Sequence, residues 1–368
     1  MPDIFQHGDA IGPFKVIHIY RPAMGLRAVV AIDNIACGPA IGGIRMAPDV
    51  SAKEAIRLAR AMTLKNAAAG LAHGGGKSVV FGDPAMPVAD KEKLLRGFAT
   101  AIAELSEYIP GPDMGTDERC MGWVHDEIGR AVGLPREIGG IPLDEVGATG
   151  FGLAAAVDVA RTYAGIDLKG ARVAIQGFGA VGMNAARFLA AMGARLVAAS
   201  DSRGTIANPA GMDVAALIAL KRGGQPISNF GGGEKSASDA IIDVECDIWI
   251  PAARPDYIDA GNAPRLKCRI VAEGANIPLT EEAEQILLRR NILVIPDFIA
   301  NAGGVICAAV ELHGGTESSA FGTIDEKIRR NTREVLDEAR RTGDAPRVAA
   351  VAMAKRRIDS AAATRRWR

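Results

Sequence analysis

A glycine-rich turn between an apolar strand and a helix constrains this chain more than any other feature. The strand sequence 171–176 is followed by Gly177, Gly179 and Gly182 in the pattern G-x-G-x-x-G, and the helical sequence 183–193 comes next. The first glycine permits a tight turn, the second lets the backbone approach a pyrophosphate, and the third allows close helix–strand packing. The helix N-terminus then offers unpaired N–H groups to phosphates. The sequence therefore predicts a dinucleotide site.

The strand that follows this helix, 195–201, supplies an acid for the same site. Asp201 ends the strand, where a carboxylate accepts hydrogen bonds from the ribose hydroxyls of NAD and repels the 2′-phosphate of NADP. Ser202 and Arg203 follow directly and could hold that phosphate instead. We expect NAD rather than NADP.

Strands and helices alternate over the second part of the chain, which predicts an α/β fold with a parallel, doubly wound, Rossmann-like sheet. Further apolar strand sequences occur at 246–252, 269–275 and 292–298. Before residue 145, helical patterns are broken by Gly/Pro loops. A length of 368 residues suits two domains. We expect one domain over 1–140 plus C-terminal helices at about 330–368, and a dinucleotide-binding domain over 141–329.

Composition excludes several classes of protein. Lys and Arg number 43 against 43 Asp and Glu, so the chain lacks the positive charge that would favour nucleic acid or an anionic membrane as main partner. No apolar run is long enough to span a bilayer, and the first residues do not read as a secretory signal. The five cysteines show no CxxC or zinc spacing, which indicates reduced thiols in a cytoplasmic protein. The histidines show no metal spacing either, so no metal is expected.

Two lysines lie in a stretch that is otherwise apolar or small. Ser51 and Glu54 form a capping box that predicts a helix over 51–70, and this helix carries Lys65 near its end. Lys77 follows three glycines, which predict a turn before a short apolar strand. An ammonium group in such surroundings needs an anionic partner or loses its proton, and both behaviours suit an active site.

The sequence GGGKS around Lys77 is not a P-loop. That motif requires glycine six positions before the lysine, and Leu71 stands there. Two carboxylates follow in the loop PGPDMGTD before another predicted helix. Asp117 or Thr116 could cap that helix, whereas Asp113 has no evident capping role. Asp113 is therefore a candidate partner for a lysine in proton transfer.

Taken together, these segments resemble the Glu/Leu/Phe/Val amino-acid dehydrogenase superfamily. The likeness runs from about Gly38 to Leu312 and rests on eight motifs in order: GPAIGGIRMAP, MTLKNA, GGGKS, PGPDMGTDE, GATGFG, GFGAVG, VAEGAN and PDFIANAGGV. It implies an N-terminal substrate and oligomerisation domain, a nicotinamide-binding second domain and a homo-oligomer. The implied reaction is reversible oxidative deamination of an L-amino acid to a 2-oxo acid and ammonia.

The resemblance also assigns roles to individual residues. Lys65 would hold the substrate α-carboxylate, Lys77 would be the general base that activates water, which requires a lowered pKa, and Asp113 would hold the amino group and shuttle protons. The residues then expected at the cofactor are Thr149, Gly177, Gly179, Ala180, Val181, Gly182, Asp201, Asn276 and Asn301.

Two departures from the family pattern bear on the substrate. Glutamate-specific members carry lysine before the GG of K-G-G-x-R and serine four residues after the GG of NAGG, where this chain has Ile41 and Ala308. With Gly42 and Val305 beside them, these residues would form an apolar wall, against which a buried carboxylate loses hydration without gaining a partner. We expect a branched-chain or aromatic L-amino acid.

Other segments favour different readings. Glutamate remains the alternative substrate, with a relocated carboxylate anchor, because PGPDMGTDERCMGW, ASDSRGTIANPAGMD and IPDFIANAGGV look closer to the glutamate branch. A non-catalytic dinucleotide-binding regulator is a third possibility, although it would be expected to lose Lys77 or Asp113. His73 is expected to pack within its loop, and Cys307 to fill apolar space.

Overall fold

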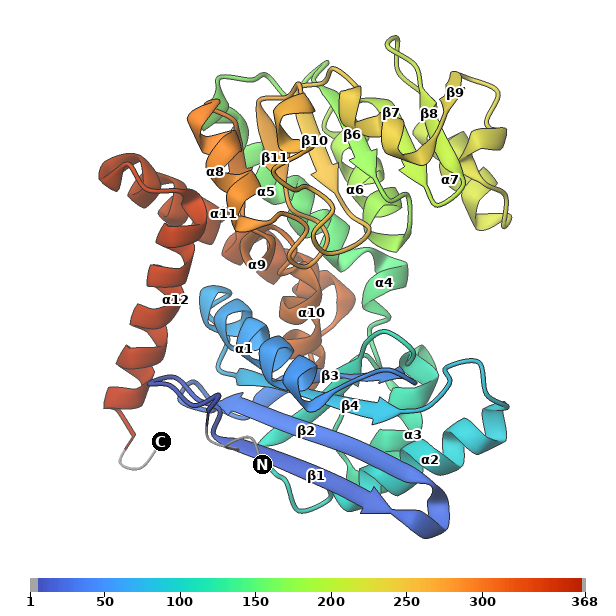
Figure 1. The fold of residues 1–368 in the computed structure, drawn as a ribbon, viewed down its shortest axis with the longest axis vertical. Helices are drawn as coiled ribbons and strands as arrows, with labels where there is room; N and C mark the ends of the chain where they lie inside the picture. Colours follow the sequence, from blue (N-terminus) through green and yellow to red (C-terminus); the bar gives the residue numbers. More distant parts are fainter. Residues whose placement is uncertain (1–5, 366–368) are drawn as a thin grey trace. The chain divides into compact units, whose positions relative to one another are not determined.

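The structure, a computed structural model, describes residues 6–365 (Figure 1). The chain folds as two compact units. The first comprises the chain up to Leu143, together with Val305–Ala320 and the chain from Ala352 onward, and the second comprises Asp144–Gly304 and Phe321–Val351. The α/β class and the two-domain organisation are as the sequence predicts.

The C-terminal chain is divided differently from the expected 330–368. Residues 321–351 group with the second unit, because helix α11 (Glu317–Thr342) is tied to α5 (Ala148–Ala164) by side-chain contacts. Arg329 of α11 forms an ion pair with Asp158 at 2.6 Å, and Asp337 accepts a hydrogen bond from the Tyr163 hydroxyl at 2.6 Å.

The first unit is built on a five-stranded mixed sheet of order β1-β2-β4-β3-β5. Strands β1, β2 and β4 pair antiparallel, whereas β3 pairs parallel with both β4 and β5. The strand bounds are β1 Lys15–Arg21, β2 Leu26–Asn34, β3 Ala40–Ala47, β4 Gly74–Phe81 and β5 Tyr108–Pro112.

Helices cover both faces of this sheet. The bounds are α1 Ala52–Ala68, α2 Val88–Ala101, α3 Glu118–Ile128 and α10 Gly303–Leu312. Alternate residues of β2 divide between the faces: Val30 and Ile32 join the core formed with α2 and α3, whereas Val29 and Ala31 pack with α1. Helix α1 begins as expected after Ser51, whose side chain accepts a hydrogen bond from the Glu54 N–H at 3.1 Å.

Two expectations in this unit are wrong. The glycines before Lys77 form the first residues of β4 instead of a turn, because α1 packs directly on them: a Cβ on Gly75 would lie 2.0 Å from the backbone nitrogen of Thr63. The apolar spacing over 90–109 predicts one helix, followed by a Pro/Gly loop, but helix α2 ends at Ala101 and Tyr108–Pro112 forms strand β5. Tyr108 is fully buried and donates from its hydroxyl to the Gly42 carbonyl at 2.8 Å, which holds this Pro/Gly strand in the sheet.

The second unit is built on a seven-stranded sheet of order β12-β11-β10-β6-β7-β8-β9. The bounds are β6 Arg172–Gln176, β7 Arg195–Asp201, β8 Gly204–Ala207, β9 Glu234–Ser236, β10 Ile248–Pro251, β11 Ile270–Ala272 and β12 Leu293–Ile295. The strands from β12 to β7 pair parallel, whereas β8 and β9 add an antiparallel edge that the sequence did not reveal.

The strand order reverses between β6 and β10, which is where a doubly wound sheet binds ligands at the carboxyl ends of its strands. Helix α6 (Ala180–Ala191) connects β6 to β7 and forms the predicted βαβ unit with them. The other helices are α4 Leu143–Val146, α7 Val214–Arg222, α8 Glu281–Arg289, α9 Asp297–Ala300 and α12 Pro346–Ala363, which belongs partly to each unit. Within residues 6–365 no helix combines the length and hydrophobicity that crossing a bilayer requires.

Candidate active site

Three charged side chains meet in the first unit. The Nζ of Lys77 lies 2.6 Å from Oδ2 of Asp113, and the Nε of Arg45 donates to the same oxygen at 3.0 Å. The other end of the Arg45 guanidinium pairs with Glu54 at 2.7 Å. The Lys77 side chain is only 8% exposed and that of Asp113 is 20% exposed, so the ion pair is largely shielded from water.

The opposing effects of burial and charge set the ionisation of Asp113. Burial by itself would raise the pKa of this carboxyl group, but the positive charges of Lys77 and Arg45 and their hydrogen bonds outweigh burial. The pKa of Asp113 is therefore lowered below its usual value, and the group is an anion at neutral pH.

Sheet register brings the ion pair together. Ile44 of β3 pairs with Ser78 of β4 on one side and with Pro112 of β5 on the other. Lys77 precedes Ser78 and Asp113 follows Pro112, so the two charged groups lie at the same level of the parallel strands.

Glycine allows the strands to approach here. A Cβ on Gly42 would lie 1.6 Å from the Gly76 carbonyl oxygen, and a Cβ on Gly43 would lie 2.7 Å from the Cβ of Asp113. Any larger residue at either position would push β3 away from its neighbours. The structure therefore gives Gly42 a packing role: it lets β3, the strand that also contains Arg45, lie close to β4.

Lys65 lies in the last turn of α1, the helix that packs on β4. The neighbouring Asn66 anchors this end of the helix, since its side-chain nitrogen donates to the Gly74 carbonyl at 2.6 Å and to the Ile41 carbonyl at 3.4 Å. Lys65 is therefore carried on the helix that packs against the strand of Lys77.

The two residues that depart from the glutamate pattern lie in one apolar cluster. Ile41 and Ala308 are buried with Ile109 and Val132, and Leu143 and Leu312 pack against them. Val305 lies one turn before Ala308 on α10 and is half-buried. The four buried members of this apolar cluster are contributed by β3, β5, the loop after α3, and α10.

The glycine turn of the second unit fits a pyrophosphate. Gly177 has a positive φ of 91°, and a Cβ on Gly182 would lie 2.2 Å from the Gly177 carbonyl oxygen. Gly179 precedes α6 without any side-chain cap, and a Cβ on it would meet open space. No side chain therefore caps the first N–H groups of α6, beginning with Ala180 and Val181, and these groups are available to bind phosphate.

Asp201 lies at the end of β7, as predicted, but its carboxylate is already bonded within the protein. Oδ2 accepts from Lys221 Nζ at 2.6 Å and from the Ile227 N–H at 3.2 Å, and Oδ1 accepts from the Arg203 N–H at 2.9 Å. The paired lysine neutralises much of the charge that would repel a 2′-phosphate.

Asn276 and Asn301 are in contact. The Asn301 side-chain nitrogen donates to Oδ1 of Asn276 at 3.1 Å and to the carbonyls of Gly274 and Ala275 at 3.3 and 3.2 Å. Oδ1 of Asn301 is buried and has no partner within residues 6–365, which leaves an acceptor suited to the carboxamide N–H of a nicotinamide. Thr149 lies near the start of α5, where a Cβ on Gly303 would come within 3.2 Å of its Cα.

Comparison with known sequences identifies the family. The sequence model described as Glutamate/Leucine/Phenylalanine/Valine dehydrogenase matches residues 139–366, and the Glu/Leu/Phe/Val dehydrogenase dimerisation domain matches residues 5–130. The chain belongs to the Glu/Leu/Phe/Val dehydrogenase family. It is therefore an amino-acid dehydrogenase, an oxidoreductase that uses a nicotinamide dinucleotide.

Several similar relatives are named glutamate dehydrogenase. That of Aeropyrum pernix is 39% identical over 82% of this chain and 77% of its own length, and that of Thermotoga maritima is 42% identical over 76% and 70%. A relative from Saccharolobus shibatae named NADP-specific is 37% identical (76% and 69% covered), and one from Staphylococcus aureus named NAD-specific is 34% identical (84% and 77% covered).

Solved structures of similar enzymes share the fold over nearly the whole chain. The hetero-hexameric glutamate dehydrogenase of Thermus thermophilus, in its Leu-bound form, has a TM-score of 0.86 at 28% identity, with 97% of this chain and 91% of that chain covered. The L-tryptophan dehydrogenase of Nostoc punctiforme has a TM-score of 0.75 at 26% identity, with 95% and 97% covered.

The structure of this dehydrogenase adds candidate site residues that sequence reasoning missed. Arg45 binds Asp113 directly, and Ile109 and Val132 complete the cluster around Ile41. No local sequence signal pointed to Arg45, because its place depends on sheet register: it follows Ile44, which pairs with Pro112 next to Asp113. The helical spacing over 90–109 extends to Ile109 and conceals its place in strand β5.

Glu311 is a further missed residue of the dehydrogenase. It lies on α10, three positions after Ala308, and its carboxylate accepts from the N–H groups of Gly133 at 2.7 Å, Leu134 at 3.2 Å and Ile141 at 2.6 Å. Burial raises the pKa of Glu311 above its usual value, although the three N–H groups oppose that shift. This carboxylate holds the loop that carries Val132.

Two smaller expectations concern His73 and Cys307. His73 packs in its loop: its Nδ1 lies 3.1 Å from the Pro39 carbonyl oxygen and its Nε2 lies 3.2 Å from Nε2 of His313. Cys307 is buried, and burial raises the pKa of its thiol to about 12, so the thiol is un-ionised at neutral pH. Within residues 6–365 no group of three or more His, Cys, Asp or Glu side chains is placed to hold a metal ion.

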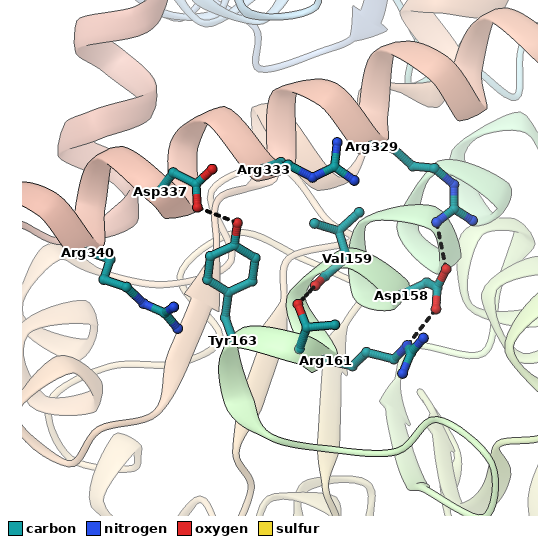
Figure 2. Close-up of a pocket in the computed structure, with 9 residues that line it drawn as sticks. Asp158, Val159, Arg161, Tyr163, Arg329, Arg333, Asp337 and Arg340 are labelled. Carbon is teal, nitrogen blue, oxygen red and sulfur yellow. Dashed lines mark hydrogen bonds and ion pairs between the residues drawn. The ribbon is translucent and has the colours of Figure 1, made fainter.

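A hollow of about 460 Å³ lies between α5 and α11 and contains none of the predicted site residues (Figure 2). Most of the charged side chains that line this hollow form ion pairs or hydrogen bonds with one another. Asp158 binds both Arg161 at 2.7 Å and Arg329 at 2.6 Å, and Arg340 stacks on Tyr163, whose hydroxyl donates to Asp337 (Figure 2). We assign the hollow no part in the reaction.

Proposed function

We propose that this enzyme deaminates an apolar L-amino acid, branched-chain or aromatic, in a reversible reaction that yields the 2-oxo acid and ammonia. The observation that carries the proposal is the apolar cluster of Ile41, Ile109, Val132 and Ala308. In this cluster Ile41 and Ala308 stand where glutamate-specific enzymes place lysine and serine. Each CH₂ group buried against such a wall gains about 0.8 kcal/mol. A side-chain carboxylate there would lose hydration without an ionic partner.

The charged residues of the first unit provide the acid–base chemistry. Lys65 holds the α-carboxylate as a fixed cation. Asp113, kept ionised by Lys77 and Arg45, accepts a hydrogen bond from the amino group and takes its proton as the Cα–N bond gains double-bond character. When bound, the nicotinamide accepts the hydride that leaves Cα.

Hydrolysis of the resulting imine requires an activated water. Asp113 returns the proton that it took from the amino group to the imine nitrogen and is ionised again, while Lys77 takes a proton from the water that attacks the imino carbon. The 2.6 Å contact with Asp113 allows that proton to pass to the carboxylate and then to the departing ammonia. Arg45 touches Asp113 from the other side and keeps one positive charge beside the pair while the proton moves.

In the second unit, we propose that the turn from Gly177 to Gly182 and the N-terminus of α6 hold the pyrophosphate, and that Thr149, Asn276 and Asn301 contact the nicotinamide side. We propose NAD as the preferred cofactor, because Asp201 presents a carboxylate at the ribose end. The pairing of Asp201 with Lys221 and the presence of Arg203 weaken that preference. Relatives named for each cofactor occur among those compared.

Glutamate is the second candidate substrate, and the names of the relatives favour it. Relatives that are 37–42% identical are named glutamate dehydrogenase, whereas the solved structure named for L-tryptophan dehydrogenase is 26% identical. Glutamate would need an ionic anchor for its side chain other than Ile41 and Ala308.

The deciding experiment measures oxidation of NADH and NADPH with ammonium and a panel of 2-oxo acids. We expect 4-methyl-2-oxopentanoate or phenylpyruvate to exceed 2-oxoglutarate in kcat/KM by about 100-fold or more, the size of effect that an unpaired buried polar group produces. Preference for 2-oxoglutarate would overturn the apolar proposal and establish the second candidate. The ratio of kcat/KM with NADH to that with NADPH shows which cofactor the enzyme prefers.

We also propose a homo-oligomer assembled through the first unit, since the dimerisation-domain model matches residues 5–130. Light scattering on the purified protein tests this, and a monomer at micromolar concentration would contradict it. A cytoplasmic location is proposed because all five cysteines are unpaired in the structure. Fractionation of cells that produce the protein tests that location.

A further inference from the structure

One arginine near the C-terminus binds three carboxylates that are distant from it in sequence. In Arg347, Nη2 donates to Oε2 of Glu273 at 2.6 Å, Nη1 donates to Oδ1 of Asp297 at 3.0 Å, and Nε donates to Glu284. The side chain of Glu273 is fully buried, and those of Glu284 and Asp297 are 8% exposed. The planar guanidinium engages all three partners at once, which a lysine ammonium with one nitrogen reproduces poorly.

The charges of this Arg347 cluster do not balance without a proton. One guanidinium faces three carboxylates, so at least one carboxyl group is driven toward its neutral form. Burial raises the pKa of Glu273 well above its usual value, and the neighbouring Asp297 and Glu284 add to this although Arg347 opposes it. Loss of Arg347 would leave several buried acids without a cation.

Two of these carboxylates, those of Glu273 and Asp297, form hydrogen bonds at the two ends of the segment from Glu273 to Ile277. Oε2 of Glu273 accepts from the Asp297 N–H at 2.9 Å, and Oδ2 of Asp297 accepts from the Ile277 N–H at 2.9 Å. Ile277 has a positive φ of 49°, a conformation that a β-branched residue adopts only when its surroundings impose it. Asp297 supplies the bond that fixes this residue.

The middle of the segment carries Asn276. The amide of Asn301 holds it by donating to Gly274, Ala275 and Asn276 in succession. Asn276 is therefore fixed from the inside by Asn301 and at both ends by the carboxylates that Arg347 binds. Glu273 and Asp297 thus connect Arg347 to the segment that contains Asn276.

We infer that Arg347 is a positioning residue for the cofactor: it clamps Glu273 and Asp297 and so fixes the segment that presents Asn276 to the nicotinamide. The inference rests on the proposed function, in which Asn276 and Asn301 contact the nicotinamide. Arg347 itself bonds to carboxylates and not to the cofactor. It would therefore control cofactor affinity and hydride transfer without taking part in the acid–base chemistry of Lys77 and Asp113.

The test compares Arg347→Lys with Arg290→Lys. Arg290 also holds the second unit together, since its Nη1 and Nη2 donate to the carbonyls of Ala263 and Leu266 at 2.8 Å each, but it does not bond to the Glu273–Ile277 segment. We expect Arg347→Lys to raise the Kd for NADH, measured by fluorescence without any substrate, by about tenfold, the size of effect that loss of a supporting partner produces at other sites. The KM for the 2-oxo acid should change little, and Arg290→Lys should lower Tm without moving the Kd.

A double variant with Asn276→Ala shows whether Arg347 acts through the segment. If it does, Arg347→Lys should weaken NADH binding much less in the Asn276→Ala background than in the wild type. Equal effects in both backgrounds, or a fall in Tm with an unchanged Kd in the Arg347→Lys enzyme, would overturn the inference. Failure of the wild-type protein to bind NADH or NADPH would instead contradict the proposed function, so the two failures are distinguishable.

Discussion

The Nζ of Lys77 lies 2.6 Å from Oδ2 of Asp113, in a part of the first unit where the lysine side chain is 8% exposed. A base and a proton carrier in direct contact can exchange a proton without an intervening water. The same oxygen also accepts from Arg45, whose positive charge favours the ionised form of Asp113 once the carboxyl group has passed its proton on. This arrangement allows the proposed roles to be separated by mutation.

Lys77→Ala should abolish turnover and leave NADH binding intact. General-base catalysis contributes about 10²–10⁴-fold, so kcat should fall by about that factor when the base is removed. Initial rates and NADH fluorescence titration are the measurements. Lys53→Ala, an exposed lysine on α1, is the matched control and should behave as the wild type. Loss of NADH binding in Lys77→Ala would show that the residue has been assigned to the wrong role.

Arg45→Met should move the acid limb of the pH–rate profile to higher pH. Arg45 is one of the two cations that lower the pKa of Asp113, so removing it lets burial raise that pKa again. Activity that requires ionised Asp113 is then lost at a higher pH than in the wild type. The measurement is kcat/KM from about pH 3 upward, because an ordinary aspartate titrates at about pH 4. Arg57→Met, at an exposed position on α1, is the control. An unchanged acid limb would mean that another group controls it.

Restoring the two missing polar residues should shift specificity toward glutamate. Ile41→Lys with Ala308→Ser places a cation and a hydroxyl where the apolar cluster now lies, and we expect the ratio of kcat/KM for glutamate over leucine to rise by about 100-fold or more. Ile41→Met changes the same position without charge and should leave the ratio nearly unaltered. If the wild type already prefers glutamate and the double variant loses that activity, the anchor lies elsewhere.

Much of the second unit could be predicted from sequence because local signals coincide there. The strand before Gly177, the helix after it and the acid at Asp201 all appear where the pattern requires. The edge strands β8 and β9 were missed because they are short, with four and three residues respectively, and pair antiparallel. Such lengths give too little alternation to distinguish a strand from a turn.

The first unit shows why the rest could not be predicted. Three consecutive glycines usually indicate a turn, and only the packing of α1 on β4 makes Gly74–Gly76 a strand. Tyr108 begins a strand with two prolines whose stability depends on pairing with β3, which is remote in sequence. Lys77 and Asp113 carried enough chemistry to be selected, but the role of Arg45 depends on the register between β3 and β5, which no local pattern reports.

His73 should make the protein less stable as the medium is acidified. Burial lowers the pKa of His73 from the ordinary 6.5, and the nearby His313 adds to this, although the bond to the Pro39 carbonyl opposes it. The unfolded chain therefore takes up a proton near pH 6.5 that the folded chain refuses, so the free energy of unfolding falls as the pH drops below that value. Urea unfolding at several pH values measures the slope. His73→Gln should reduce it, whereas His18→Gln, at an exposed position on β1, should not. Equal slopes in the wild type and His73→Gln would contradict the assignment.

Glu311→Gln should loosen the loop that carries Val132 and so weaken amino-acid binding more than cofactor binding. The carboxylate accepts three backbone N–H groups with two oxygens, and a glutamine offers one oxygen and turns its own N–H₂ toward the remaining donor. A buried donor left unpaired costs about 1–3 kcal/mol, so the free energy of unfolding should fall by that order. Because Val132 belongs to the apolar cluster with Ile41 and Ala308, the KM for the amino acid should rise while the Kd for NADH stays constant. Glu326→Gln, at a 71% exposed position on α11, is the control, and a parallel rise in both constants for Glu311→Gln would indicate general unfolding instead of a local change.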